Sequence, residues 1–295
     1  TYTDAELEAA YQADPKTYDK AAWEYVVVSG AADSTTDADG NTVQATDEEQ
    51  AAAKETAKAT AEEILAAYNS GKSLESIAGN YEKATYYNTT DATYYDGVVG
   101  NWLFDDARKD GDTEILEVGT NYYVGLFHSR GREEYKTVDI RHILITPETG
   151  TKAQGDEGYE DEQTQLKAAA RTKAEEILAQ WKSGEATEDS FAQLAMENSA
   201  DGSKYDGGLY TRVTKGWAVE EFNDWCFDAS RKDGDTGIVD TTYGSHVMYF
   251  VGYDLPAWAA SVTSDLQEKA ASEWSTALSE NADVQQSDFG MKFVG

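Results

Sequence analysis

Two histidines lie within segments that have the composition of β-strands. His142 lies in the β-branched, apolar stretch Val138–Ile145, and His246 lies in the stretch 243–250. Side chains alternate between the two faces of a strand, so each histidine shares its face with the residues two positions away. These neighbours are Ile140 and Leu144 for the first histidine, and Met248 for the second. Imidazoles can exchange a proton near neutral pH or bind a metal. A single histidine in a strand is most often a packed residue, so a functional role for these two depends on evidence from other segments.

Three later segments give His142 a context. They read Asn198-Ser199-Ala200-Asp201-Gly202-Ser203, then Gly207-Gly208, then Tyr243-Gly244-Ser245-His246-Val247-Met248. A strand histidine, Ser-x-Asp-Gly, Gly-Gly and x-Gly-x-His, in this order, resemble the parvulin family of peptidyl-prolyl isomerases, and in particular the extracytoplasmic foldase lipoproteins of bacteria. The ordered set is more specific than its members, because Gly-Gly alone predicts only a turn.

The resemblance implies a fold and a set of site residues. It implies a four-stranded antiparallel sheet wrapped by helices, in which the two histidine strands are neighbours and their imidazoles hydrogen-bond to each other. Carried over position by position, it assigns a linked polar, catalytic floor to His142, Asp201, Thr241 and His246. It assigns the apolar pocket for the substrate to Tyr210, Trp217, Ala218 and Phe222.

The sequence departs from the family pattern at the rim of that pocket. The usual Gly-Gly-Asp-Leu-Gly is replaced by Gly207-Gly208-Leu209-Tyr210-Thr211, and Ala218 stands where the family often has Met. The loop after the first strand, 146–162, carries acidic residues where phosphate-specific members have basic ones. A preference for phosphoserine is therefore not expected, because like charges repel.

Metal binding is an alternative chemistry for the same residues. His142, Asp201 and His246 could in principle ligate a metal, but the family uses none, so neither a metal nor another cofactor is expected. An Asp-rich loop around Asp37 lacks carboxylates at the first and last positions of a calcium loop and is better explained as an Asp-Gly turn. Cys226 is expected to be a buried apolar residue, and His128 has no assigned role.

The chain contains an internal repeat. Ala174-Glu175-Glu176-Ile177-Leu178-Ala179 repeats Ala61-Glu62-Glu63-Ile64-Leu65-Ala66, and Arg231-Lys232-Asp233-Gly234-Asp235-Thr236 repeats Arg108-Lys109-Asp110-Gly111-Asp112-Thr113. A period of about 115 to 125 residues indicates a duplicated domain and not a solenoid. The predicted fold class is therefore α+β, with two tandem parvulin-like domains and terminal helices. The predicted ranges are 1–18 (linker helix), 19–130 (degenerate domain), 135–254 (isomerase domain) and 255–295 (helix and tail).

The first copy lacks the motif residues. Alignment on the strands puts Tyr25 at the position of His142, Tyr123 at that of His246 and Val118 at that of Thr241. No counterpart of Gly-Gly is found in 81–97, which is predicted to be a loop rich in Tyr and Thr. The first copy is therefore expected to be catalytically silent, with a structural or polypeptide-binding role for its many tyrosines.

Several local expectations can be checked directly. The stretch 29–49 is predicted to be a loop, a short helix is expected over Trp102–Ala107, and a longer one over 257–281. Residues 284–294 could form a short strand or dock on another module.

Composition limits the partners. The chain has 295 residues with 24 basic and 56 acidic side chains, a net charge of −32. Such a charge repels phosphate backbones and anionic membrane surfaces, so nucleic acid is not an expected partner. No stretch is long and apolar enough for a membrane span, and the chain begins at Thr1, so any export signal or lipid anchor would lie upstream.

Together these observations predict a peptidyl-prolyl isomerase and foldase that acts on X–Pro bonds of exported, unfolded polypeptides. The active site is expected in the second copy. The protein is expected to be located outside the cytoplasm, at the bacterial surface or membrane. The alternative is a non-catalytic chaperone that uses both domains only to bind polypeptides. The sequence leaves the client proteins, the organism and the oligomeric state open.

Overall fold

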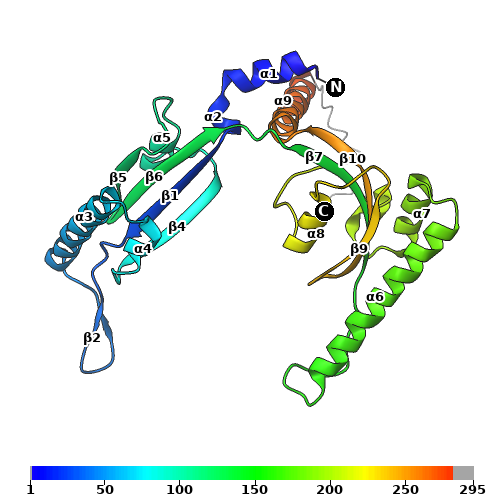
Figure 1. Ribbon diagram of the computed structural model, residues 1–295, viewed down its shortest axis with the longest axis horizontal. Helices are drawn as coiled ribbons and strands as arrows, with labels where there is room; N and C mark the ends of the chain where they lie inside the picture. Colours follow the sequence, from blue (N-terminus) through cyan, green and yellow to red (C-terminus); the bar gives the residue numbers. More distant parts are fainter. Residues whose placement is uncertain (1, 282–295) are drawn as a thin grey trace, which may run out of the picture. The chain divides into compact units, whose positions relative to one another are not determined.

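The computed structural model describes residues 2–281. The chain divides into two compact units, Thr1–Glu133 and Glu134–Gly295 (Figure 1). Each unit contains one four-stranded antiparallel sheet with helices on its faces. The predicted α+β class with two tandem sheets of this kind is therefore confirmed.

The sheet of the first unit has the strand order β4-β1-β6-β5. Its strands are β1 (Lys20–Val28), β4 (Ala84–Ala92), β5 (Thr113–Val118) and β6 (Asn121–Gly131). The buried positions of β1 alternate with partly exposed ones over most of its length, as expected for a strand with a helix on one face and a second apolar layer on the other.

Two apolar layers cover the faces of this sheet. On one face, α3 (Asp47–Asn69) and α4 (Leu74–Ala78) pack on Val26, Val28 and Val124. A capping box between Thr46 and Glu49 begins α3. On the other face, α5 (Val98–Leu103) packs with Trp23, Leu116 and Phe127.

The N-terminal segment is part of the first unit. It consists of α1 (Asp4–Ala13), which begins with a capping box at Thr3, and α2 (Pro15–Tyr18). Leu7 and Tyr11 are buried, and the Tyr11 hydroxyl donates to Asp19 at 2.7 Å. This hydrogen bond and the Arg132–Glu8 ion pair attach α1 to the sheet.

The second unit repeats this topology with the order β8-β7-β10-β9. Its strands are β7 (Lys136–Ile145), β8 (Leu209–Val213), β9 (Thr236–Thr241) and β10 (Gly244–Pro256). On one face lie α6 (Tyr159–Ser183) and α7 (Glu188–Asn198), and on the other α8 (Glu220–Cys226). A short 3-10 helix η1 (Gly202–Asp206) precedes β8, and α9 (Ala257–Asn281) follows β10 over the predicted range.

The structure corrects three local predictions. The Tyr- and Thr-rich stretch forms β4, because its β-favouring residues pair along β1. The predicted loop at 29–49 contains a small hairpin of β2 (Thr35–Thr36) and β3 (Thr42–Val43), closed by an Asp37–Gly40 turn. The helix expected over Trp102–Ala107 is α5, which begins four residues earlier at Val98. The segment 284–294, for which a strand was considered, lies outside the described residues.

No helix in the described part of the chain is long and apolar enough to cross a membrane.

Candidate active site

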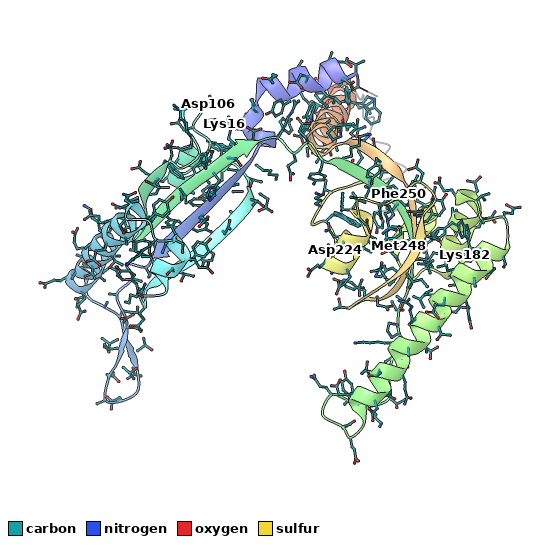
Figure 2. The ribbon with its side chains drawn as sticks, in the orientation of Figure 1. Lys16, Asp106, Lys182, Asp224, Met248 and Phe250 are labelled. Atoms are coloured by element: carbon teal, nitrogen blue, oxygen red, sulfur yellow. The ribbon has the colours of Figure 1, made fainter. Side chains whose placement is uncertain are left out.

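The two histidines meet on neighbouring strands of the second unit. Met248 lies opposite His142 in the β7–β10 register, and Leu144 lies opposite His246, so the histidines are diagonal neighbours on one sheet face. Their Nδ1 atoms are 3.1 Å apart and their rings are stacked with 17° between the planes. Both side chains are buried. Met248 and Phe250 extend the same row along β10 (Figure 2).

Asp201 reaches His142 because the end of α7 is tied to the edge of β7. The Ser199 hydroxyl accepts a hydrogen bond from the Leu144 amide at 3.0 Å, and the Ala200 amide donates to the Leu144 carbonyl at 2.9 Å. The chain then turns into η1, with Asp201 as its N-cap. As a result, Asp201 Oδ1 lies 3.3 Å from His142 Nε2.

One carboxylate oxygen of Asp201 accepts several hydrogen bonds. Besides His142, its Oδ1 accepts from the Ser203 amide at 2.8 Å, from the Ser203 hydroxyl and from the Tyr210 hydroxyl at 2.9 Å. Burial alone would raise the pKa of Asp201, but these hydrogen bonds and the nearby imidazole lower it to about 2. The carboxylate is therefore ionised at neutral pH and can act only as an acceptor.

The ionised Asp201 carboxylate determines which nitrogen of each histidine donates a hydrogen bond and which accepts one. Burial lowers the pKa of His142, and burial followed by the neighbouring imidazole lowers that of His246 to about 4, so both rings are neutral at pH 7. An acceptor at Asp201 favours a proton on His142 Nε2, which leaves His142 Nδ1 to accept from His246 Nδ1. His246 Nε2 then accepts from the Thr241 hydroxyl at 2.9 Å. The result is one chain of hydrogen bonds from Thr241 to Asp201, each polarising the next.

The histidine pair lies at the floor of a cavity of about 470 Å³. Of the eight residues that the sequence assigned to the site, seven line this cavity: His142, Asp201, Tyr210, Trp217, Ala218, Phe222 and His246. The eighth, Thr241, lies one hydrogen bond behind His246 and faces a second cavity beside α6. The resemblance thus brought together residues that are as far apart as His142 and His246, which are separated by 104 positions.

Aromatic rings form the walls. Phe222 meets both imidazoles edge-on, with centroids 5.4 and 5.3 Å away. The centroid of the Tyr210 ring lies 5.4 Å from that of His142 and 4.7 Å from that of Trp217. Trp217 is half exposed at the rim of the cavity. Ala218 adds a small wall residue where a larger one would narrow the space.

Residues 124–251 match the PPIC-type PPIase domain family. The chain contains a parvulin-type PPIase domain. In sequence it is similar to Foldase protein PrsA 1 of Listeria innocua, with 29% identity over 142 residues. The match covers 46% of this chain and 39% of that relative, so the chain spans well under half of its length.

Solved structures with the same kind of domain are more distant. PrsA from Bacillus subtilis is 23% identical, with a TM-score of 0.34 and coverage of 52% of each chain. A structure of SurA-like chaperones from Campylobacter jejuni is 22% identical, with a TM-score of 0.29, and the match covers 52% of this chain and 56% of that one.

The sequence assignment missed three residues that line the cavity of the PPIase domain and one that lies beside Asp201. Ser203 bonds to Asp201 and lies 3.4 Å from His142 Nε2, while Tyr243, Gly216 and Val219 line the rim. Ser203 follows Asp201 by two residues, directly after the Ser-x-Asp-Gly motif, and could have been found there. Tyr243 is the first residue of the segment that contains His246, but its approach to the cavity depends on the turn that joins β9 to β10.

Arg141 fixes the Gly-Gly turn of the PPIase domain. Its guanidinium donates to the carbonyls of Asp206 and Gly207 and pairs with Glu188 at 2.9 Å. Gly208 has φ +75°, and a Cβ there would lie 2.3 Å from the His142 carbonyl oxygen. Glycine is therefore required for the turn to lie against β7 and place η1 beside the histidines.

The polar groups of the PPIase domain bond to one another instead of converging on a cation. Within residues 2–281 no group of three His, Cys, Asp or Glu side chains is arranged to hold a metal ion. The two Nδ1 atoms face each other, which does not favour the metal-site alternative for His142, Asp201 and His246. Cys226 is buried as expected, and burial raises the pKa of its thiol to about 12.

The first unit has different residues at the same strand positions. Tyr25 lies opposite Gly125, as His142 lies opposite Met248, and Tyr123 lies opposite Val27, as His246 lies opposite Leu144. The aligned positions predicted for the two copies are therefore equivalent in the sheets. In addition, Tyr87 of β4 lies opposite Tyr25, where Gly208 bonds to His142. The Gly-Gly turn therefore has no counterpart here, since β4 continues through this position and carries a tyrosine.

Proposed function

We propose that this protein is a peptidyl-prolyl cis-trans isomerase and foldase, with its active site in the second unit. The proposal is supported above all by the hydrogen-bonded chain Thr241–His246–His142–Asp201 at the floor of an aromatic-lined cavity. Its substrates are unfolded or partly folded polypeptides that contain X–Pro bonds, and its location is outside the cytoplasm.

The reaction needs no covalent chemistry. Rotation about an X–Pro bond has a barrier of about 20 kcal/mol, which comes from lost amide resonance. The twisted amide is less polar than the planar one, so a cavity that excludes water favours the transition state. The rings of Tyr210, Trp217 and Phe222 supply such walls for the proline ring, and the missing bulk at Ala218 leaves room for it.

The polar floor has a different task. A neutral imidazole pair held by an ionised Asp201 offers fixed dipoles beneath the rotating amide without placing a full positive charge there. Thr241 and Asp201 keep each ring in one tautomer and one orientation. Asp201 accepts hydrogen bonds from four donor groups, so it serves to position His142, and no nucleophile is required.

The decisive experiment is an isomerase assay with short, unphosphorylated X–Pro peptides. The double variant His142→Ala/His246→Ala should lose at least about a hundredfold in kcat/KM, because both members of the floor are removed. His128→Ala is the matched control: this third histidine pairs with Glu24 in the first unit and should leave kcat/KM unchanged. No catalysis by folded wild-type protein would disprove the proposed activity.

A second candidate is a chaperone that binds polypeptides without isomerising them. The absence of both histidines from the first unit favours it for that unit. Suppression of aggregation by the His142→Ala/His246→Ala variant, equal to that of wild type, would support this candidate.

A further inference from the structure

The first unit carries a cluster of tyrosines at the place where the second unit has its histidines. We call Tyr25, Tyr87, Tyr95 and Tyr123, together with Val118, the aromatic patch. The Tyr25 ring is stacked with those of Tyr87 and Tyr123, at centroid distances of 5.0 and 5.8 Å. It also lies 4.0 Å from the Trp23 ring, which is part of the core beneath. Burial is the main cause that raises the pKa of Tyr25. The nearby hydroxyls of Tyr123, Tyr87 and Tyr95 raise it further.

The aromatic patch is more exposed than core packing requires. Tyr87 is 45% exposed, Tyr95 54% and Val118 37%, while Tyr25 and Tyr123 are half-buried. Gly100 allows the backbone of Tyr95 to lie against α5, since a Cβ there would meet the Tyr95 carbonyl oxygen. A contiguous apolar surface of this kind on a folded unit indicates a binding site.

The segments that carry the aromatic patch have charge of one sign. The ranges 23–28, 84–98 and 113–124 contain no Lys or Arg, and their exposed acidic residues Asp91, Asp96 and Glu114 have no ion-pair partner among the described contacts. Glu24 and Glu117 lie on the other face of the sheet, where they pair with His128 and Lys54. Such a surface attracts cations and repels anionic ligands. Tyrosine faces also bind Lys and Arg through cation–π contacts, and in the same unit Lys16 Nζ lies 5.5 Å from the centroid of the Tyr94 ring.

The adjacent strand favours an extended ligand. β4, which carries Tyr87, is the edge strand of its sheet. The outer backbone groups of an edge strand can pair with an added chain, and tyrosine rings pack against proline rings in extended segments.

We propose that the aromatic patch binds an extended, positively charged polypeptide segment that contains proline, and holds it without isomerisation. This inference rests on the proposed polypeptide-binding function, but it concerns a different surface. Tyr25 and Tyr123 occupy the strand positions of the two histidines, and their rings are stacked in a row with Tyr87, so the ligand lies on the patch and meets no imidazole pair. The first unit then retains a segment of a client while the second acts on another.

The test uses the whole chain and a labelled peptide composed of Lys, Pro and Ala. Binding is measured by fluorescence anisotropy, and the number of sites by calorimetric titration. Tyr87→Ser/Tyr95→Ser should weaken binding about tenfold or abolish one equivalent, because exposed tyrosines are strong contributors at such surfaces. Tyr253→Ser is the matched control, since Tyr253 is also 45% exposed but lies on β10 of the second unit, outside the cavity. It should change binding less than twofold.

Each result has a defined meaning. Unchanged binding by Tyr87→Ser/Tyr95→Ser would overturn the inference, as would equal affinity for a peptide with Glu in place of Lys. A wild-type dimer that this variant dissociates, measured by sedimentation velocity, would show that a second copy covers the patch and would overturn it too. The double tyrosine variant should keep full isomerase activity. If wild type has no isomerase activity but patch binding depends on Tyr87 and Tyr95, the inference stands and only the proposed activity fails.

Discussion

The two units place different side chains on the same arrangement of strands. In the second unit, His142 lies opposite Met248, and Gly208 beside it lets η1 approach with Asp201 and Ser203. In the first unit, Tyr25 lies opposite Gly125, whose missing side chain leaves room for the rings of Trp102 and Trp23. A glycine thus has a different use in each unit. Gly208, just before β8, allows a polar turn to approach β7, and Gly125 on β6 leaves room for a larger aromatic core.

This exchange explains why one unit has a cavity with a polar floor and the other a filled surface. A stacked row of tyrosines needs no buried acceptor, because Tyr25, Tyr87 and Tyr123 are all partly exposed. The imidazole pair, in contrast, needs Asp201 and Thr241 to satisfy its nitrogens. The two units therefore differ in the partners that the residue on the central strand requires. The imidazole of His142 needs hydrogen-bonding partners, and the ring of Tyr25 needs other rings to stack on.

The largest expected effect comes from the glycine of the second unit. Gly208→Ala should lower the free energy of unfolding of that unit by about 3 kcal/mol, because a Cβ at positive φ would also clash with the His142 carbonyl. Urea unfolding of the whole chain, followed through both transitions, measures the loss.

Gly234→Ala provides the control for Gly208→Ala. Its φ of +83° is similar, but the nearest atom is the Tyr249 hydroxyl oxygen at 3.9 Å. Only the backbone cost of about 1 kcal/mol is expected. Equal losses for the two variants would contradict the close approach of the Gly-Gly turn to β7.

Acid should destabilise the second unit more than the first. The pKa of His246 is lowered from 6.5 to about 4. Between these two pH values the native unit therefore binds fewer protons than the unfolded chain. Its contribution to stability is complete above about pH 6.5 and is lost as the pH falls toward about 4. A loss on the order of 2 kcal/mol is expected for the transition of the second unit, measured by urea unfolding at a series of pH values.

His246→Gln tests the origin of this pH dependence, because it removes the titrating group. The variant should reduce the slope of the profile between pH 6.5 and 4, and the remaining slope comes from His142, whose pKa burial also lowers. His128→Gln in the first unit should leave the transition of the second unit unchanged. A profile that keeps its slope in His246→Gln would refute the assignment.

The smallest effect concerns the hydroxyl behind the histidine pair. Thr241→Val installs the residue of the first unit, Val118, and removes the donor to His246 Nε2. One neutral hydrogen bond of about 1 kcal/mol corresponds to roughly a fivefold loss in kcat/KM for X–Pro peptides, with a shifted pH profile because His246 is less constrained. The reciprocal change, Val118→Thr at an exposed site, should have no effect on catalysis. If Thr241→Val retains both rate and pH profile, the hydrogen bond has no part in positioning His246.

Part of the fold and the candidate site could be derived from the sequence. The repeated segments predicted two similar domains, and the two sheets have the same strand order. The period of two in a strand predicted one face each for His142 and His246, and the resemblance predicted their contact. These properties depend on local periodicity and on motifs of a few residues, which the chain carries wherever it folds.

Other features were decided only by the tertiary structure. The stretch around Tyr87 became a strand because β1 offered an unpaired edge, and that pairing placed Tyr87 on Tyr25. The direction of the hydrogen bonds from Thr241 to Asp201 depends on donors from three separate segments meeting at one oxygen. Cross-strand register and the packing of turns involve residues far apart in the chain, and no local pattern encodes their distance.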